Sequence, residues 1–139
     1  MTNPTKLITY SDGGARGNPG PAGIGGVIYN EKHQVVAQVS QYLGETTNNQ
    51  AEYRALIAVL EKAAKLGARE VVCYLDSELV VKQLRHEYKI KNKDLAPLFL
   101  KVYNLSVGFS KISFNHIPRE QNQEADRLAN EAMDRGLGR

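Results

Sequence analysis

The sequence predicts an α/β fold in which one mixed sheet is covered by helices. Strand-like segments separated by turn residues fill the first third of the chain, a long segment with helical periodicity follows, and a nearly all-apolar strand comes next. A strand, helix, strand order places the helix over the sheet as a right-handed crossover between parallel strands. We therefore expect antiparallel and parallel pairs in one sheet.

The first three strands form an antiparallel meander. They are predicted at KLITYSD (residues 6–12), AGIGGVIYN (22–30) and QVVAQVSQYL (34–43). A Gly-rich turn follows the first strand, and the polar segment EKHQ joins the other two.

A long amphipathic helix is predicted over residues 46–67. Its apolar residues recur at helical spacing, Asn48 or Asn49 can cap its start, and Gly67 suits a left-handed end. The next strand, REVVCYLD (69–76), has the composition of a strand buried on both faces in a parallel arrangement.

The rest of the chain predicts two helical stretches, a last strand and a final helix. These are SELVVKQLRHE (77–87), DLAPLFLKVYNLSVG (94–108), KISFNHI (111–117) and NQEADRLANEAMDRG (122–136). Ser77 can cap the first of these helices, and Pro97 can enter the first turn of the second. The sequence has no repeat or linker, so residues 1–139 are expected to form a single domain.

The composition is that of a soluble globular protein, with 42% apolar and 24% charged residues. No long apolar run and no signal-like segment occurs at the start, so we expect a cytoplasmic protein without membrane contact. Cys73 is the single cysteine, which excludes an intrachain disulfide and a cysteine-rich zinc cluster. We expect it to be a packed strand residue rather than a nucleophile. No heptad or exposed apolar stripe is evident, which favours a monomer.

The charge distribution favours a polyanionic partner. The net charge is +3, the isoelectric point is near 9.0, and KQLRHEYKIKNK (82–93) holds five Lys or Arg residues and one acid. Such a run is either solvated surface or part of a nucleic-acid-binding face.

Four acids lie near the ends of predicted elements. Asp12 and Asp76 end the first and fourth strands, and adjacent parallel strands would bring both carboxylates to one sheet edge. Glu52 and Asp126 lie early in two helices, from which they can lean toward that edge. Each acid alone has an ordinary alternative, as a turn or cap residue or as a complement to a helix dipole.

Together, four carboxylates at one edge would repel each other unless cations lay among them. Oxygen-only ligands select Mg²⁺ or Mn²⁺ over zinc. Two such ions about 4 Å apart activate water for an in-line displacement at phosphorus, so the predicted chemistry is phosphodiester hydrolysis. The segment SDGGARGNPGPAG (11–23) would let a duplex backbone approach closely, although a plain hairpin turn is the alternative.

Four blocks in chain order, YSDGGARGNPGPAG, TTNNQAEYRALIAVL, LDSELVV and REQNQEADRLA, closely resemble type 1 ribonuclease H from about Leu7 to Ala132. The resemblance implies a five-stranded mixed sheet of order 3-2-1-4-5 flanked by helices. It also implies cleavage of the RNA strand of RNA/DNA hybrids with Mg²⁺ or Mn²⁺, which leaves a 3′-hydroxyl and a 5′-phosphate. Double-stranded RNA stays open as a second substrate.

The resemblance also assigns residues. The family's four catalytic and metal-binding acids match Asp12, Glu52, Asp76 and Asp126. Matches to substrate-contacting positions are Asn18, Asn48 and Asn49 for the hybrid, Thr47 for a DNA phosphate, Glu78, and the backbone of Gly13, Ala15 and Gly17 for RNA 2′-hydroxyls.

The chain departs from the best-known bacterial members in two places. It is shorter between the third and fourth acids and lacks their basic protrusion, so binding is expected to depend on YKIKNKDL, with Lys89, Lys91 and Tyr88. The segment before the last helix is too short for the usual histidine-bearing loop. His116 falls inside a strand pattern and is expected at the surface, so Arg119 is the candidate cation near the scissile phosphate.

Two other functions are compatible with parts of this pattern. A catalytically silent hybrid-binding module would use the same basic run, but would have no reason to keep four mutually repelling acids. An integrase or junction resolvase would share the fold and change the substrate.

Overall fold

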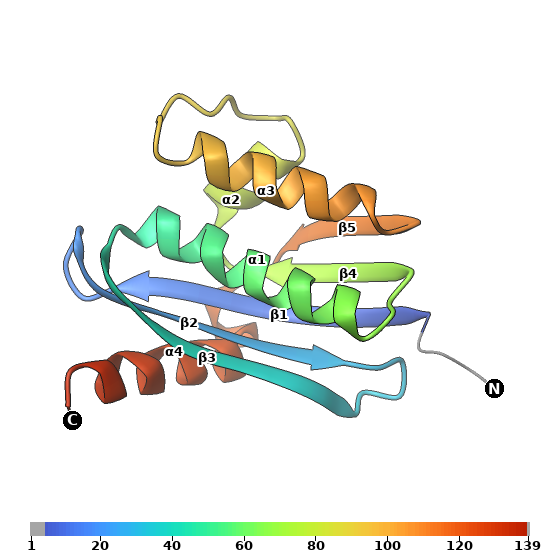
Figure 1. The fold of residues 1–139 in the computed structure, drawn as a ribbon, viewed down its shortest axis with the longest axis horizontal. Helices are drawn as coiled ribbons and strands as arrows, with labels where there is room; N and C mark the ends of the chain where they lie inside the picture. Colours follow the sequence, from blue (N-terminus) through green and yellow to red (C-terminus); the bar gives the residue numbers. More distant parts are fainter. Residues whose placement is uncertain (1–4, 139) are drawn as a thin grey trace.

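The five strands form one mixed sheet in the order β3-β2-β1-β4-β5, which confirms the predicted topology (Figure 1). The fold is seen in a computed structural model that describes residues 5–138. The strands are β1 (Lys6–Ala15), β2 (Gly20–Tyr29), β3 (Val35–Thr46), β4 (Glu70–Leu75) and β5 (Lys111–His116). The β1–β2 and β2–β3 pairs are antiparallel, whereas β1–β4 and β4–β5 are parallel. Ser11 pairs with Leu75, so Asp12 and Asp76 follow at the same level.

Four α-helices cover the two faces of the sheet. They are α1 (Asn48–Lys65), α2 (Glu78–Leu84), α3 (Ala96–Val107) and α4 (Gln123–Gly136), with a 3-10 turn at Arg119–Gln121 before α4. A side chain at Gly26 would meet Val59 of α1, whereas one at Gly25 would meet Ala125 of α4. Because neighbouring strand residues point to opposite faces, α1 and α4 lie on opposite sides of the sheet.

The main apolar core lies on the α1 side. Its fully buried side chains come from α1, β1, β4, α2 and α3, for example Leu56, Leu7, Val71, Val80 and Val102. Burial of this interface, rather than helix propensity, is what holds α1 against β1 and β2. The end of α1 that carries Glu52 is therefore fixed against the sheet edge.

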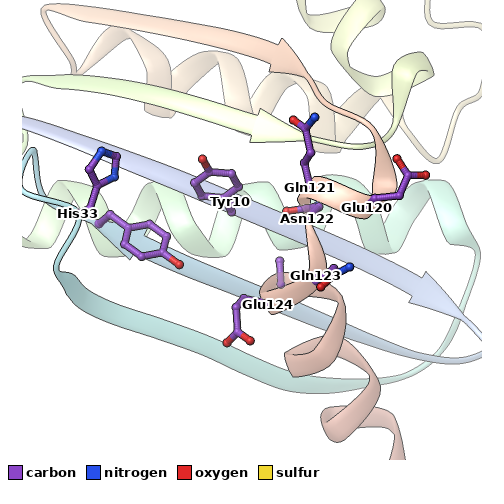
Figure 2. Close-up of a pocket in the computed structure, with 9 residues that line it drawn as sticks. Tyr10, His33, Glu120, Gln121, Asn122, Gln123 and Glu124 are labelled. Carbon is purple, nitrogen blue, oxygen red and sulfur yellow. The ribbon is translucent and has the colours of Figure 1, made fainter.

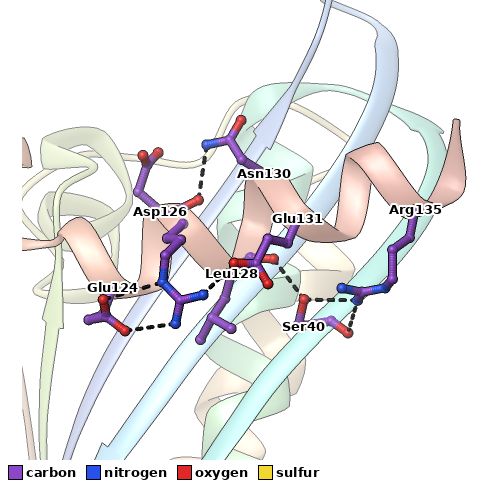
Figure 3. Close-up of polar contacts among 8 residues, drawn as sticks. Ser40, Glu124, Asp126, Leu128, Asn130, Glu131 and Arg135 are labelled. Carbon is purple, nitrogen blue, oxygen red and sulfur yellow. Dashed lines mark hydrogen bonds and ion pairs between the residues drawn. The ribbon is translucent and has the colours of Figure 1, made fainter. Parts of the chain in front are cut away.

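Polar contacts fasten α4 to β3 (Figure 3). The Ser40 hydroxyl donates to the Leu128 carbonyl at 2.7 Å, and the Arg135 guanidinium donates to the Ser40 hydroxyl at 2.9 Å. Asp126 and Asn130 project from another side of the helix in this view, and the Asn130 amide donates to the Asp126 carbonyl at 3.0 Å. The orientation of α4 thereby turns Asp126 away from β3.

Local details differ from the sequence-based predictions in two places. β1 does not end at Asp12 but continues to Ala15, because the Gly-rich residues keep ladder partners on β2, such as Gly13 opposite Ile24. The N-cap of α1 is Thr47, whose hydroxyl accepts from the Gln50 N–H, and not Asn48 or Asn49. The Ser77 cap is confirmed.

One face of α3 is apolar and exposed, contrary to the expectation that no such stripe exists. The side chains of Leu100, Tyr103 and Val107 lie three and four residues apart and are each more than half exposed. The helix packs inward through the fully buried Val102 and the partly buried Leu98, Phe99 and Leu105. None of the helices within residues 5–138 is long and apolar enough to cross a bilayer.

Candidate active site

Three carboxylates meet where β1 and β4 approach the start of α1. Asp12 comes from β1, Asp76 follows β4, and Glu52 lies in the second turn of α1. One oxygen of each lies within 4.8 Å of the others. Asp12 is 9% exposed and Glu52 only 7%. Because Glu52 lies beyond the first turn of α1, its place is not explained by the helix dipole.

The fourth predicted acid, Asp126, lines the same cleft. The cleft has a volume of about 550 Å³ and is also bounded by Gly13, Ala15, Asn48, Asn49 and Arg119. Arg119 is on the 3-10 turn, with its side chain 79% exposed, and a guanidinium nitrogen lies 3.8 Å from Asp126 Oδ1. The cleft therefore brings together all four predicted acids and the predicted cation.

Burial and mutual repulsion make full ionisation of this cluster unfavourable. Burial raises the pKa of Asp12 to about 10, and the carboxylates of Glu52 and Asp76 add to the effect. Burial also raises the pKa of Glu52 to about 7, although hydrogen bonds from Asp12 and Gly13 oppose the increase. A cation between the acids would remove both penalties. The donor set consists of oxygen alone and fits a hard divalent ion.

Gly13 fixes Glu52 in the cluster. Its main-chain N–H donates to Glu52 Oε1. A Cβ at this position would lie 2.1 Å from the Ala51 carbonyl oxygen of α1. We expected Gly13 to give a duplex access to the backbone, but the structure shows that α1 occupies that side and uses its N–H. A comparable restriction applies to Ala15, whose N–H donates to Asn48 Oδ1 at 2.7 Å.

The other predicted substrate contacts from the first half lie at or beside the cleft. Asn18 is at the tip of the β1–β2 turn with Gly17, and its Oδ1 accepts from the Asn48 N–H at 3.1 Å. Thr47 caps the helix that carries Asn48 and Asn49. These contacts tie the turn to the start of α1, which fixes the spacing of the asparagines.

Glu78, Lys89 and Lys91 do not line the cleft. Glu78 is exposed in the first turn of α2 and pairs with Lys82 at 3.5 Å. Lys89 lines a separate cavity of about 450 Å³ with Tyr88. Lys91 is exposed in the connection between α2 and α3. The basic segment therefore forms a surface apart from the acids.

Two residues outside the cleft have simple structural places. His116 is exposed at the end of β5 and is not among the residues that line the cleft. Cys73 is fully buried, and burial raises the pKa of its thiol to about 12, so it stays protonated and unreactive at neutral pH.

Three residues of the site were not predicted from the sequence. Arg16 lines the cleft and pairs with Asp134 at 2.7 Å, and Asn130 lies beside it. Asn122 donates to Asp76 Oδ2 at 2.9 Å. Asn122 and Asn130 flank Asp126 at a spacing of four residues on either side, a helical pattern that was available in the sequence.

The sheet is mixed, and its carboxylates cluster where the central parallel strands β1 and β4 approach the start of α1. These features define the class: an α/β protein whose site can hold divalent ions. Comparison with known proteins gives the family: the family described as Reverse transcriptase-like matches residues 10–132. The chain belongs to the type 1 ribonuclease H family, whose members it also resembles in structure.

Three relatives illustrate the match. The N-terminal ribonuclease H domain of Rv2228c from Mycobacterium tuberculosis superposes with a TM-score of 0.91 at 48% identity, covering 93% of this chain and 99% of that one. Ribonuclease H1 from Halobacterium salinarum gives a TM-score of 0.91 at 43% identity, covering 94% and 98%. LC11 ribonuclease H1, solved in complex with an RNA/DNA hybrid, gives 0.90 at 48% identity, covering 94% and 99%.

The chain spans only part of the length of two of these relatives. It spans 36% of the M. tuberculosis bifunctional protein Rv2228c and 65% of the H. salinarum ribonuclease HI. The similarity therefore concerns the ribonuclease H portion of those proteins.

Proposed function

We propose that this protein is an endoribonuclease that hydrolyses the RNA strand of RNA/DNA hybrids and leaves 3′-hydroxyl and 5′-phosphate ends. The observation that carries the proposal is the cluster of Asp12, Glu52 and Asp76, with oxygens within 4.8 Å of one another. Membership of the family and the hybrid bound to LC11 ribonuclease H1 support the same substrate. Residues 1–139 would act as a single catalytic domain.

The four acids would hold divalent ions, Mg²⁺ or Mn²⁺. Two bound ions supply activation of water and stabilisation of the leaving oxygen. The protein's part is to hold the carboxylates close together before the ions arrive, and burial of Asp12 and Glu52 does this at the expense of their ionisation. Asp126, partly exposed at the cleft wall, completes the set from α4.

The substrate would be held by the asparagines at the start of α1. Since Asn48 Oδ1 already accepts from Ala15, the Asn48 amide nitrogen is left to donate to the nucleic acid. Asn49 lines the cleft beside it, and Asn18 and Thr47 hold the turn and helix in place. Hydrogen bonds to 2′-hydroxyls in this cleft would distinguish RNA from DNA.

Arg119 would supply a positive charge beside the scissile phosphate. Its guanidinium is exposed at the cleft and lies 3.8 Å from Asp126. An arginine stays charged and cannot move a proton at neutral pH, so its contribution is to bind the phosphate or to help release product.

The decisive experiment is cleavage of an end-labelled RNA/DNA hybrid next to matched double-stranded RNA, with Mg²⁺, Mn²⁺ or EDTA. We expect metal-dependent cutting of the RNA strand of the hybrid by wild type and none by Asp12→Asn. Binding without cleavage under any metal would instead identify a hybrid-binding module. Cutting of a four-way DNA junction in preference to the hybrid would identify a resolvase. The double-stranded RNA lane tests that second substrate directly.

We also propose that the active form is a cytoplasmic monomer. Gel filtration across a range of concentrations tests the oligomeric state, and the exposed apolar stripe on α3 makes the test necessary.

A further inference from the structure

Asn122 makes an unusual pair of hydrogen bonds at the edge of the sheet. It directly precedes α4 and is only 1% exposed. Its Nδ2 donates to the Ser11 carbonyl and to Asp76 Oδ2, each at 2.9 Å. Figure 2 shows it in the connection between β5 and α4, where it lines a pocket together with Tyr10. A single amide group thus joins Ser11, within β1, to Asp76, the residue that follows β4.

The orientation of this amide follows from its partners. The Ser11 carbonyl and the Asp76 carboxylate both accept, so only the NH₂ end of Asn122 can face them. The opposite end, Oδ1, is buried without a hydrogen-bond partner among the described residues. A buried acceptor without a partner is unfavourable. The two donated bonds must therefore outweigh that loss.

Helix capping does not explain the position of the Asn122 side chain. An asparagine before a helix usually accepts a hydrogen bond from an N–H of the first turn. Asn122 occupies the N-cap position of α4, but its side chain makes no such bond. Its main-chain carbonyl does accept from the Asp126 N–H at 3.1 Å. The side chain is therefore directed to the strands, while the backbone leads into the turn that carries Asp126.

Asn122 is linked by hydrogen bonds to three of the four acids or to the residue next to them. Asn122 bonds Asp76 directly, bonds the carbonyl that precedes Asp12, and accepts from the N–H of Asp126. We propose that Asn122 is a positioning residue that sets the Asp76 carboxylate relative to Asp12 and so prepares the acids for a divalent ion. The expected effect of Asn122 on catalysis rests on the proposed function, whereas its expected effect on ion binding does not.

Carboxylates that ligate metals are commonly held by such outer partners, whose removal weakens metal binding or activity by about 10–100-fold. We therefore expect Asn122→Ala to weaken binding of Mn²⁺ alone by about tenfold or more, measured by isothermal titration calorimetry without nucleic acid. With hybrid as substrate, kcat should fall while KM for the hybrid stays close to that of wild type.

Asn115→Ala is the matched control. The Asn115 amide also donates to a strand carbonyl, that of Cys73, at 3.2 Å, but it contacts none of the four acids. Its removal should lower the thermal midpoint and leave Mn²⁺ binding unchanged. Equal weakening of Mn²⁺ binding in both variants would mean that removing any hydrogen bond to a strand has this effect, and would overturn the proposal.

Asn122→Ser provides a second test should the alanine variant not fold. Serine is a good N-cap residue but is too short to reach both acceptors, so α4 keeps its start while Asp76 loses its partner. Wild-type Mn²⁺ affinity in a folded Asn122 variant would overturn the inference. Wild type that binds Mn²⁺ but does not cut the hybrid would instead defeat the proposed function, with the Asn122 effect on ion binding still measurable.

Discussion

The main-chain N–H of Gly13 and the carboxylate of Glu52 are joined by a buried hydrogen bond between β1 and α1. A Cβ at residue 13 would lie 2.1 Å from the Ala51 carbonyl oxygen and 2.6 Å from the Glu52 nitrogen. Both atoms belong to the helix backbone and cannot turn aside. The absence of a side chain at Gly13 is thus what lets α1 bring Glu52 to the other acids.

Gly13→Ala should therefore displace the start of α1 and with it Glu52. We expect a loss of about 2 kcal/mol or more in the free energy of unfolding, since overpacking against a fixed backbone is relieved only by moving it. The rate of hybrid cleavage should also fall, because Glu52 moves away from the other acids together with the start of α1. Gly14→Ala is the control for folding, because its nearest atom would be Asn48 Oδ1 at 3.9 Å. Similar urea midpoints for the two variants would contradict this account.

Asp12→Asn should abolish cleavage and yet stabilise the protein without metal. The substitution keeps the shape of the side chain and removes one carboxylate from a buried cluster. We expect a gain of about 1–2 kcal/mol in EDTA, or roughly 3–8 °C in the thermal midpoint. In Mg²⁺ or Mn²⁺ the advantage should shrink or reverse, because wild type gains stability from ion binding. A lower thermal midpoint for Asp12→Asn than for wild type in EDTA would show that the clustered acids do not destabilise the metal-free protein.

Metal-free stability should decrease as the pH rises. The pKa of Asp12 is raised to about 10 and that of Glu52 to about 7, whereas both groups titrate near 4 in an unfolded chain. Between the unfolded and folded pKa values, the folded state keeps protons that the unfolded state has released. The stability that the two groups contribute below about pH 4 is therefore lost as the pH rises through their pKa values in the folded state. Thermal midpoints in EDTA between pH 5 and 9 test this. The slope should be shallower in Asp12→Asn, and a slope equal to that of wild type would contradict the assignment.

The antiparallel meander, the parallel crossover and the site edge were predictable because periodicity and crossover handedness depend on residues close together in sequence, whereas the full strand order was implied by the resemblance to type 1 ribonuclease H. The four acids were identified for the same reason: each lies beside a recognisable end of an element. The sequence pattern could not show that the Gly-rich segment continues β1, since glycine is common in both turns and strand irregularities. For the same reason, the sequence pattern did not show that the Gly13 N–H is used within the protein, by Glu52.

Contacts between distant residues were beyond reach of the sequence pattern. The Asn122 side chain bonds Ser11 and Asp76, which lie 111 and 46 residues away. Arg16 meets Asp134 across an even longer separation. Such pairs depend on the packing of α4 against the sheet, and a local pattern carries no information about it. The exposed stripe on α3 was missed because periodic apolar residues alone do not show which face packs inward.

Arg119→Ala should reduce turnover without affecting stability. The side chain is 79% exposed and contacts Asp126 across 3.8 Å, so its ion pair contributes little to folding. A phosphate contact made during the reaction would contribute about 10–100-fold to kcat, or roughly 1.4–2.8 kcal/mol. Arg127→Ala is the matched control: its guanidinium pairs with Glu124 and Glu131 on the same helix and does not line the cleft. Unchanged kcat in Arg119→Ala with normal metal response would remove Arg119 from the reaction.

The basic segment gives a prediction about salt. Lys89 and Lys91 are exposed and do not line the acidic cleft, so we expect them to contact the backbone of a bound duplex and not the reacting phosphate. Replacing both with Gln should weaken hybrid binding at every salt concentration, and should reduce the slope of log K against log salt by about one for each phosphate that the variant no longer neutralises. The effect should appear in KM, with kcat at saturating hybrid near that of wild type.

Lys32→Gln, at the exposed β2–β3 turn, is the control, because that turn lies at the opposite end of the sheet from the start of α1 (Figure 1). An equal change of slope in Lys32→Gln would indicate a diffuse attraction to the positively charged protein, and an unchanged slope in the double variant would place the hybrid elsewhere.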